Sequence, residues 1–180
     1  MENLKEQIDC CKDCNLHKLT YNIKDVSKGT GKLHGWAVNP KNVKAFFIGM
    51  NPSWNRFPNL ELAFGGYNYD KGTGVGFVKL LESLGVIDKC YVTNLVKCST
   101  TDNKITEAQT KACLKHLTAE IKEYNPKVLV CMGNDAYNNV NLKFDKPTIK
   151  IWHPNYIFSY NRTKLKEYES QIMDIFEICN

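Results

Sequence analysis

The sequence contains no long hydrophobic run. Its longest apolar segments are AFFIGM (45–50) and KVLVCM (127–132), and both are far too short to span a bilayer. The amino-terminal residues read MENLKEQIDCCKDC and lack the hydrophobic stretch of a signal peptide. We therefore expect a cytoplasmic protein that does not insert into a membrane.

Internal repeats, low-complexity tracts and recognisable linkers are also absent from the sequence. A chain of 180 residues with 43% apolar side chains has enough material for one domain with a sizeable core. We expect a single domain over residues 1–180 and a monomer. The formal charge of +5 suits a polyanionic partner, but it also suits an ordinary solvated surface, so the charge alone decides nothing.

Cysteine, by contrast, is abundant. The chain has eight cysteines, and disulfides are rare in the cytosol, so metal binding becomes the first explanation to consider. Cys11 and Cys14 form a C-x-x-C pair, a spacing that lets two thiolates converge on one metal or cluster. A redox pair or chance would give the same spacing, and Cys10 beside the pair is a spare thiol.

Short apolar segments alternate with stretches of helical periodicity. The apolar segments are typical of buried parallel strands and cover residues 43–49, 90–96, 127–133 and 148–153. The helical stretches cover residues 74–85, 106–124, 134–141 and 163–179, the second of them with Thr106 as N-cap. This alternation predicts an α/β fold, a three-layer α/β/α sandwich around a central four-stranded parallel sheet. Residues 28–42 are expected to form a long loop.

Polar side chains follow three of the predicted strands. Asn51 comes just after the first, Asn94 lies at the end of the second, and His153 lies at the end of the fourth. Ligands of open α/β sheets bind outside the carboxyl ends of the strands, so these groups are expected to face one cleft. Each of them alone also fits a structural role, as a turn residue, a strand-end cap and a histidine before a proline turn.

Five motifs carry a resemblance to a known family. They are FFIGMNPS (46–53), YVTNLVKC (91–98), KACLKHL (111–117), PKVLVCMGNDA (126–136) and WHPNYI (152–157). Their order and approximate spacing resemble the uracil-DNA glycosylase superfamily, over most of the chain. The overall pattern is most similar to the iron-sulfur branch, family four. The first motif departs from that branch, because GMNPS looks like the single-strand-selective and mismatch-specific uracil glycosylases, which carry an asparagine here.

The family-four resemblance implies a set of metal ligands. It places four thiolates around a 4Fe–4S cluster, those of Cys11, Cys14, Cys98 and Cys113. Zinc also accepts four thiolates and remains a physical alternative. Cys90, Cys131 and Cys179 stand in apolar surroundings and are expected in the core.

The resemblance also implies the reaction, hydrolysis of the N-glycosidic bond of a pyrimidine flipped out of DNA. This reaction makes a cationic sugar and a departing base anion, so it needs a placed water and a donor to the base. Asn51 would orient the water. His153 would donate to the pyrimidine O2, a contact worth about 3 kcal/mol by analogy with oxyanion-hole donors. The side-chain amide of Asn94 pairs with the N3–H and O4 edge of uracil, and cytosine presents the reverse pattern.

The remaining site residues follow the same comparison. Phe64 would stack on the flipped base, although a core phenylalanine fits the sequence equally well, and Gly49, Met50 and Ser53 are assigned to the base pocket. Ser53 leaves open the space at C5 where the strictest uracil enzymes carry a tyrosine, so a C5-modified pyrimidine is admitted unless a tyrosine of the loop covers the gap. The candidates for that cover are Tyr67 and Tyr69.

Residues after His153 are expected to meet the DNA. The resemblance implies a wedge of Ile157 and Tyr156 that fills the hole left by the flipped base, with Phe158 as a neighbour. Basic residues beyond the wedge either meet phosphates or form a solvated helix face, and they are Arg162, Lys164 and Lys166.

Three alternatives remain open at the level of sequence. The chain could be a glycosylase directed at modified bases of foreign (phage) DNA, a defence role. It could also bind nucleic acid without cleaving it, as a metal-stabilised module. A covalent DNA-trapping relative is disfavoured, because no basic loop ending in histidine lies near the first motif.

Overall fold

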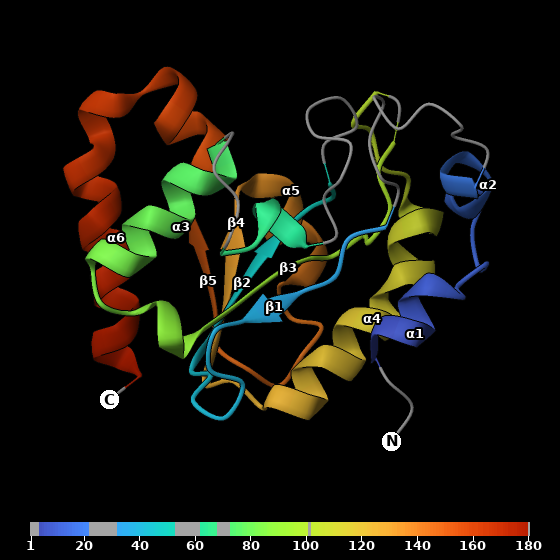
Figure 1. The fold of residues 1–180 in the computed structure, drawn as a ribbon, viewed down its shortest axis with the longest axis horizontal. Coiled ribbons are helices and arrows are strands. Elements are labelled where there is room, and N and C mark those ends of the chain that lie inside the picture. Colours follow the sequence, from blue (N-terminus) through green and yellow to red (C-terminus); the bar gives the residue numbers. More distant parts are fainter. Residues whose placement is uncertain (1–3, 22–31, 53–61, 68–72, 101, 180) are drawn as a thin grey trace.

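A five-stranded sheet forms the centre of the computed structural model, which describes residues 4–21, 32–52, 62–67, 73–100 and 102–179 (Figure 1). Its strands are β1 (Trp36–Ala37), β2 (Ala45–Gly49), β3 (Cys90–Asn94), β4 (Val128–Met132) and β5 (Thr148–Ile151). They lie in the order β1-β3-β2-β4-β5. The last four are mutually parallel, and β1 pairs with β3 in the antiparallel sense.

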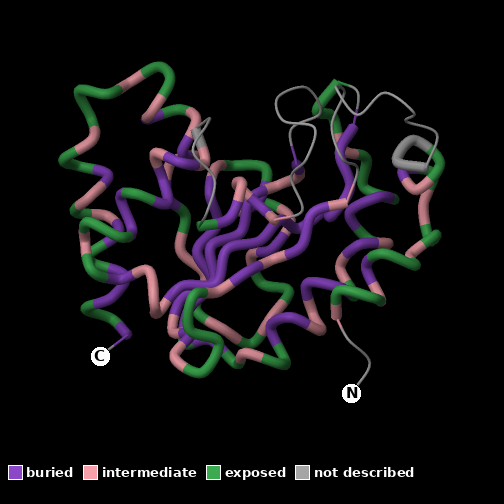
Figure 2. Tube along the Cα trace, viewed as in Figure 1, coloured by how far each residue is buried: buried purple, intermediate pink, exposed green. Residues whose placement is uncertain are grey.

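Helices cover both faces of the sheet, as the alternation in the sequence predicts. Along β2, Phe47 packs in a cluster with side chains of α3 (Thr73–Ser83) and α6 (Leu165–Ile178). Phe46 points the other way and packs with side chains of α4 (Glu107–Tyr124) and α5 (Asn134–Val140). Successive side chains of a strand alternate between the two faces, so a strand buried on both sides needs an unbroken apolar run. Figure 2 shows the buried strands between helices with exposed outer surfaces.

The amino-terminal residues add two short helices that the sequence pattern did not reveal, α1 (Leu4–Asp9) and α2 (Leu16–Tyr21). Of these, α1 contacts α4. The predicted cap of α4 is confirmed as a capping box, in which Thr106 Oγ1 accepts from the backbone N–H of Gln109 and Gln109 Oε1 accepts from the backbone N–H of Thr106.

The expected three-layer α/β fold is confirmed, with two corrections. The sheet has five strands within the described residues, where four were expected. The additional strand, β1, lies in the stretch 28–42 that was expected to be a loop, because Trp36 and Ala37 pair with Val92 and Tyr91. Two residues are too few for their periodicity to predict a strand. None of the described helices combines the length and apolarity needed to cross a membrane.

Candidate active site

The carboxyl ends of β2 and β3 meet at one edge of the sheet. Gly49 is the register partner of Asn94, and the backbone N–H of Leu95 donates to the carbonyl oxygen of Gly49 at 2.8 Å. A Cβ added to Gly49 would lie 2.5 Å from Oδ1 of Asn94 and 2.8 Å from Cζ of Phe64. A side chain at position 49 would therefore overlap both groups, and glycine allows them to meet over the strand end.

Phe64 belongs to a short 3-10 turn, Ala63–Gly65, that reaches this edge from another part of the chain. Its backbone is left-handed, with a φ of 55°, a conformation that costs a residue with a side chain about 1 kcal/mol or more. The ring centroid lies 5.9 Å from that of His153 and 6.1 Å from that of Phe77. An apolar ring held in a strained turn beside polar groups forms one wall of the candidate site.

His153 follows the end of β5, where the sequence placed it. Its Nδ1 accepts a hydrogen bond of 3.1 Å from the backbone N–H of Asn155. Burial lowers the pKa of His153 below its ordinary value of 6.5, and the charge of Asp135 opposes this only in part. The ring is therefore neutral at pH 7 and carries its proton on Nε2, the ring nitrogen that can donate a hydrogen bond.

This protonation state gives a testable expectation. Because Nδ1 is an acceptor and the pKa is lowered, we expect the neutral Nε2–H form of His153 to persist from pH 8 down to at least 6.5. Nitrogen-15 NMR of the histidine side chains, assigned with His153→Gln, checks this directly. A ring that titrates above pH 6.5 would contradict the lowered pKa, and a neutral ring protonated on Nδ1 would contradict the hydrogen bond from Asn155.

Asn94 is almost fully enclosed, with 2% of its surface exposed. Its Oδ1 is buried and has no hydrogen-bond partner among the described residues. An unsatisfied buried polar atom costs about 1–3 kcal/mol, so each such atom needs an explanation, and one explanation is a bound ligand. The amide is thus available to a ligand that presents a hydrogen-bond donor at the strand edge.

Asn51 and Met50 continue the chain from the end of β2. Both are half-buried, and Met50 packs against the cluster that also contains Phe46. The side-chain amide of Asn51 donates to the carbonyl oxygen of Pro52 at 3.0 Å. Ser53, the residue on which the C5 argument depends, lies outside the described residues, as does Tyr69. Tyr67 is described and is 46% exposed.

A second candidate site lies beside the carboxyl end of β3. One pocket, of about 300 Å³ including its part open to solvent, is lined by all the cysteines of the predicted ligand set. These are Cys11, Cys14, Cys98 and Cys113. The structure therefore brings together thiols from the amino-terminal segment, from the residues after β3 and from α4.

Hydrogen bonds and an ion pair hold the amino-terminal segment against α4. Gln109 Nε2 donates to Asn15 Oδ1 at 3.0 Å, and Lys115 pairs with Asp13. The backbone carbonyl of Cys11 accepts from Lys32 Nζ at 3.0 Å. The segment that carries the C-x-x-C pair is thereby fixed next to the helix that carries Cys113.

The lining of this cysteine pocket is compatible with a bound metal group. Burial raises the pKa of the Cys98 thiol to about 12 and also raises that of Cys113, so both are neutral thiols until a metal replaces the proton. His116 is 4% exposed, and its Nε2 has no partner in the described part of the chain although His116 lines the pocket. Among the described residues, no three or more His, Cys, Asp or Glu side chains are arranged as they would be around a bound metal ion.

Comparison with known proteins assigns the family. The model of the uracil DNA glycosylase superfamily matches residues 36–177. The chain belongs to this superfamily. That membership confirms the resemblance seen in the sequence, and the predicted enzyme class, a DNA glycosylase.

Similar proteins agree with this assignment. A Type-4 uracil-DNA glycosylase of Archaeoglobus fulgidus is 24% identical over 203 residues, which cover 99% of this chain and 93% of that protein. A Type-4 uracil-DNA glycosylase of Thermotoga maritima is 24% identical over 184 residues, with 92% and 87% covered. The crystal structure of wild-type Pedobacter heparinus SMUG2 has the same fold, with a TM-score of 0.52, 12% identity and 98% of both chains covered.

The described structure bears on the DNA wedge that the sequence predicts. Ile157 has no exposed surface and packs in the core cluster of α3 and α6, so in this conformation it cannot enter a duplex. It lies in a single wide turn, Tyr156–Tyr160, that directs Ile157 inward. Tyr156 is 40% exposed, and its ring centroid lies 5.9 Å from that of Trp152. Of the two predicted wedge residues, only Tyr156 has the exposure that the role requires.

We therefore expect Tyr156→Ala to slow base release from duplex DNA about 10-fold and to leave release from single strands nearly unchanged. Only a duplex has a hole to fill when its base leaves the stack. Single-turnover rates on matched single- and double-stranded oligonucleotides measure the difference. Tyr160→Ala is the control, because Tyr160 is also an exposed tyrosine, with 71% of its surface accessible. Equal losses on both substrates would argue against a wedge.

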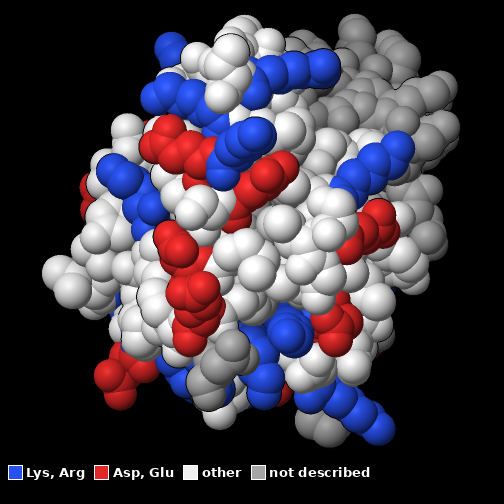
Figure 3. Space-filling view, turned by 90° about the vertical axis from the view of Figure 1, so that its left-hand side faces the viewer, with Lys and Arg blue, Asp and Glu red and all other residues white. Residues whose placement is uncertain are grey.

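The described residues on the face of α3 and α6 form no single basic patch. Figure 3 shows Lys and Arg side chains along its upper edge, with Asp and Glu side chains intermixed below. Lys164 Nζ lies 4.6 Å from the ring centroid of Trp152, the residue before His153. Arg162 Nε donates to the carbonyl oxygen of Phe158. The mixed charges favour a solvated face for α6.

Sequence reasoning missed the buried charges next to the pocket. Lys97 and Glu120 are each 1% exposed and form an ion pair. A signal was present, because Glu120 stands three residues after Leu117 and so shares the buried face of α4. A carboxylate on that face requires a buried partner of opposite charge. Lys97 is a candidate for that partner, because it comes directly after the predicted apolar strand 90–96.

Proposed function

We propose that this chain is a monofunctional DNA glycosylase that flips out uracil or a C5-modified pyrimidine, hydrolyses its N-glycosidic bond and leaves an abasic site. The observation that carries the proposal is the convergence of four groups at one edge of the sheet. They are Gly49 at the end of β2, the buried side-chain amide of Asn94, the ring of Phe64 in its strained turn and the neutral imidazole of His153.

The proposed mechanism begins with recognition of the flipped base. Phe64 offers a flat apolar wall on which a pyrimidine stacks. The amide of Asn94 has one donor and one acceptor side by side, which complement the O4 and N3–H of uracil. Its Oδ1 lacks a partner in the described part of the chain, and the N3–H of uracil would satisfy it. Cytosine has no hydrogen on N3 and a donor at position 4, so it would leave buried groups unpaired.

Bond cleavage would then be aided from two sides. The departing base gains negative charge on O2, and Nε2–H of His153 would donate to that oxygen more strongly as the charge develops. A neutral donor suffices for this task, and the hydrogen bond from Asn155 keeps the ring oriented. On the sugar side, Asn51 would hold the attacking water. A cationic sugar needs a well-placed nucleophile more than a strongly activated one, so an amide is adequate.

The thiolates of Cys11, Cys14, Cys98 and Cys113 would hold a 4Fe–4S cluster. All four cysteines line one pocket, which supports a metal group that they share. The cluster would supply a structural cross-link between the amino-terminal segment, α4 and the residues after β3, because hydrolysis involves no electron transfer.

A direct assay tests the proposed function. Oligonucleotides that carry uracil, 5-hydroxymethyluracil, a glucosylated pyrimidine or only ordinary bases are incubated with the protein, and alkali then cleaves any abasic site. We expect strand cleavage at uracil, and cleavage at the 5-substituted bases if position 53 leaves C5 open. Preference for the glucosylated base would indicate the defence role. Binding to every oligonucleotide with release of none would overturn the glycosylase proposal.

A further inference from the structure

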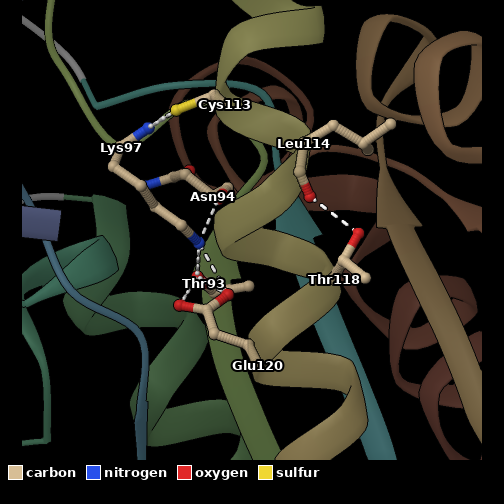
Figure 4. Close-up of polar contacts among 7 residues, drawn as sticks. All are labelled: Thr93, Asn94, Lys97, Cys113, Leu114, Thr118 and Glu120. Atoms are coloured by element: carbon tan, nitrogen blue, oxygen red, sulfur yellow. Dashed lines mark hydrogen bonds and ion pairs between the residues drawn. The ribbon is translucent and has the colours of Figure 1, made fainter. Parts of the chain in front are cut away.

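A buried ion pair contacts the backbone of Asn94. Lys97 Nζ and Glu120 Oε2 are 2.6 Å apart, and each side chain is 1% exposed (Figure 4). Lys97 follows β3 and Glu120 belongs to α4, so the pair joins the sheet to the helix that covers it.

The ammonium group of Lys97 has all its hydrogen-bonding capacity used. An ammonium has three N–H donors, and three acceptors surround this one. Besides Glu120, they are Thr93 Oγ1 at 2.7 Å and the backbone carbonyl oxygen of Asn94 at 2.7 Å. The hydroxyl of Thr93 also contacts both carboxylate oxygens of Glu120, at 3.2 and 3.1 Å, and can donate to one of them. Tyr91 also shares a side-chain hydrogen bond with Glu120, so each group of the cluster helps to fix the next.

The contact with Asn94 is the one that matters for the pocket. The pairing of β1 with β3 covers only Trp36↔Val92 and Ala37↔Tyr91, so in the described register β1 does not reach Asn94. Lys97 Nζ donates to the backbone carbonyl oxygen of Asn94, which β1 does not bond in this register. The backbone N–H of Lys97 donates to Cys113 Sγ at 3.3 Å, which anchors the lysine at its other end.

Stability alone does not account for this pair. Desolvation of two charges offsets most of their attraction, and apolar side chains of similar volume are often equally or more stabilising. A pair of this kind is better suited to fixing geometry, because each acceptor position is set by short directional bonds. The geometry fixed here is that of the backbone that carries the buried amide.

We propose that Lys97, with Glu120 as its counter-ion, is the positioning residue that sets the orientation of Asn94 toward the target base. This inference rests on the proposed function, since it assigns to Asn94 the recognition of uracil. Lys97 itself is covered by its partners and acts only through the backbone of Asn94.

A double-mutant cycle tests the proposal. Lys97→Met/Glu120→Leu removes both charges together, so that neither is left buried without a partner. We expect this variant to stay folded and to release uracil about 10- to 100-fold more slowly in single turnover, the range expected when a binding group is misplaced. In an Asn94→Ala background the same double replacement should cause less than a 2-fold further loss, because the group through which it acts is gone.

The control is Thr118→Val. Thr118 Oγ1 donates to the carbonyl oxygen of Leu114 at 2.9 Å within α4 and has no part in the bonds to Asn94 (Figure 4). We expect its rate to equal that of wild type. A charge-free variant that excises uracil at the wild-type rate, or one that loses the same factor with and without Asn94, overturns the inference.

If the double replacement does not fold, Thr93→Val takes its place. It removes one acceptor of Lys97 Nζ and leaves the charges paired. The expected loss is about 3- to 10-fold, again only when Asn94 is present, and an equal loss in both backgrounds overturns the inference. Failure of the proposed function can be distinguished from failure of this inference, because in that case the wild-type protein would itself release no base.

Discussion

Replacing Asn51 by alanine is expected to lower the single-turnover rate of base release about 100-fold or more, while folding and DNA binding stay nearly intact. This is the size of effect found when an interaction made only in the transition state is lost. Pro52 confines the backbone of Asn51 to extended conformations, and the side chain is half-buried, so the amide has little freedom and can hold a water in place. His153→Ala should lose a similar factor through the departing base.

The measurement is alkaline cleavage of a uracil-containing oligonucleotide, with enzyme in excess over DNA. Asn39→Ala is a matched control, because Asn39 is an exposed asparagine in the turn before β2, at the opposite end of that strand. We expect wild-type rates from it. If Asn51→Ala cleaves as fast as wild type on every susceptible base, Asn51 is a turn residue and the water is held by another group.

The second large effect concerns the cysteine pocket. Protein purified without oxygen should be brown and contain about four irons per chain. Cys98→Ser should lose the colour and melt roughly 10 °C or more below wild type. A bound metal group stabilises only the folded state, and a loss of a few kcal/mol lowers the melting temperature of a chain of this size by about that much. Absorbance, iron analysis and thermal unfolding measure the three quantities.

Cys10→Ser is the control for the cysteine pocket. Cys10 is exposed and adjacent to Cys11, but it does not line the pocket, so its replacement should change neither iron content nor stability. One mole of zinc per chain in colourless protein would point to the single-ion alternative. A folded and active wild type that contains neither metal would overturn the cluster.

Much of the fold followed from the sequence. Four runs of apolar residues predicted the parallel strands, and all four are present to within about two residues at each end. The same patterns gave the large helices and the cap at Thr106, because local periodicity and capping chemistry depend on neighbours in the chain. The core cysteines Cys90, Cys131 and Cys179 are buried as expected.

Contacts between distant segments explain what the sequence left undetermined. The strand β1 exists because Trp36 and Ala37 find a partner in β3, and the inward turn of Ile157 depends on packing against α3 and α6. Neither the strand β1 nor the inward position of Ile157 can be predicted from the local periodicity of apolar residues.

The sequence by itself determined which residues stand at the carboxyl ends of the strands, and the resemblance implied a set of four cysteines that line one pocket in the structure. Strand ends can be located from local pattern, and the resemblance supplied the family, which the comparison confirmed. Only the tertiary structure decided how these groups face one another: Phe64 against Gly49, Oδ1 of Asn94 without a partner in the described part of the chain, and Lys97 buried against Glu120. These relations depend on the register of β2 with β3 and on the packing of α4 over the sheet, and both are set by long-range burial of apolar surface.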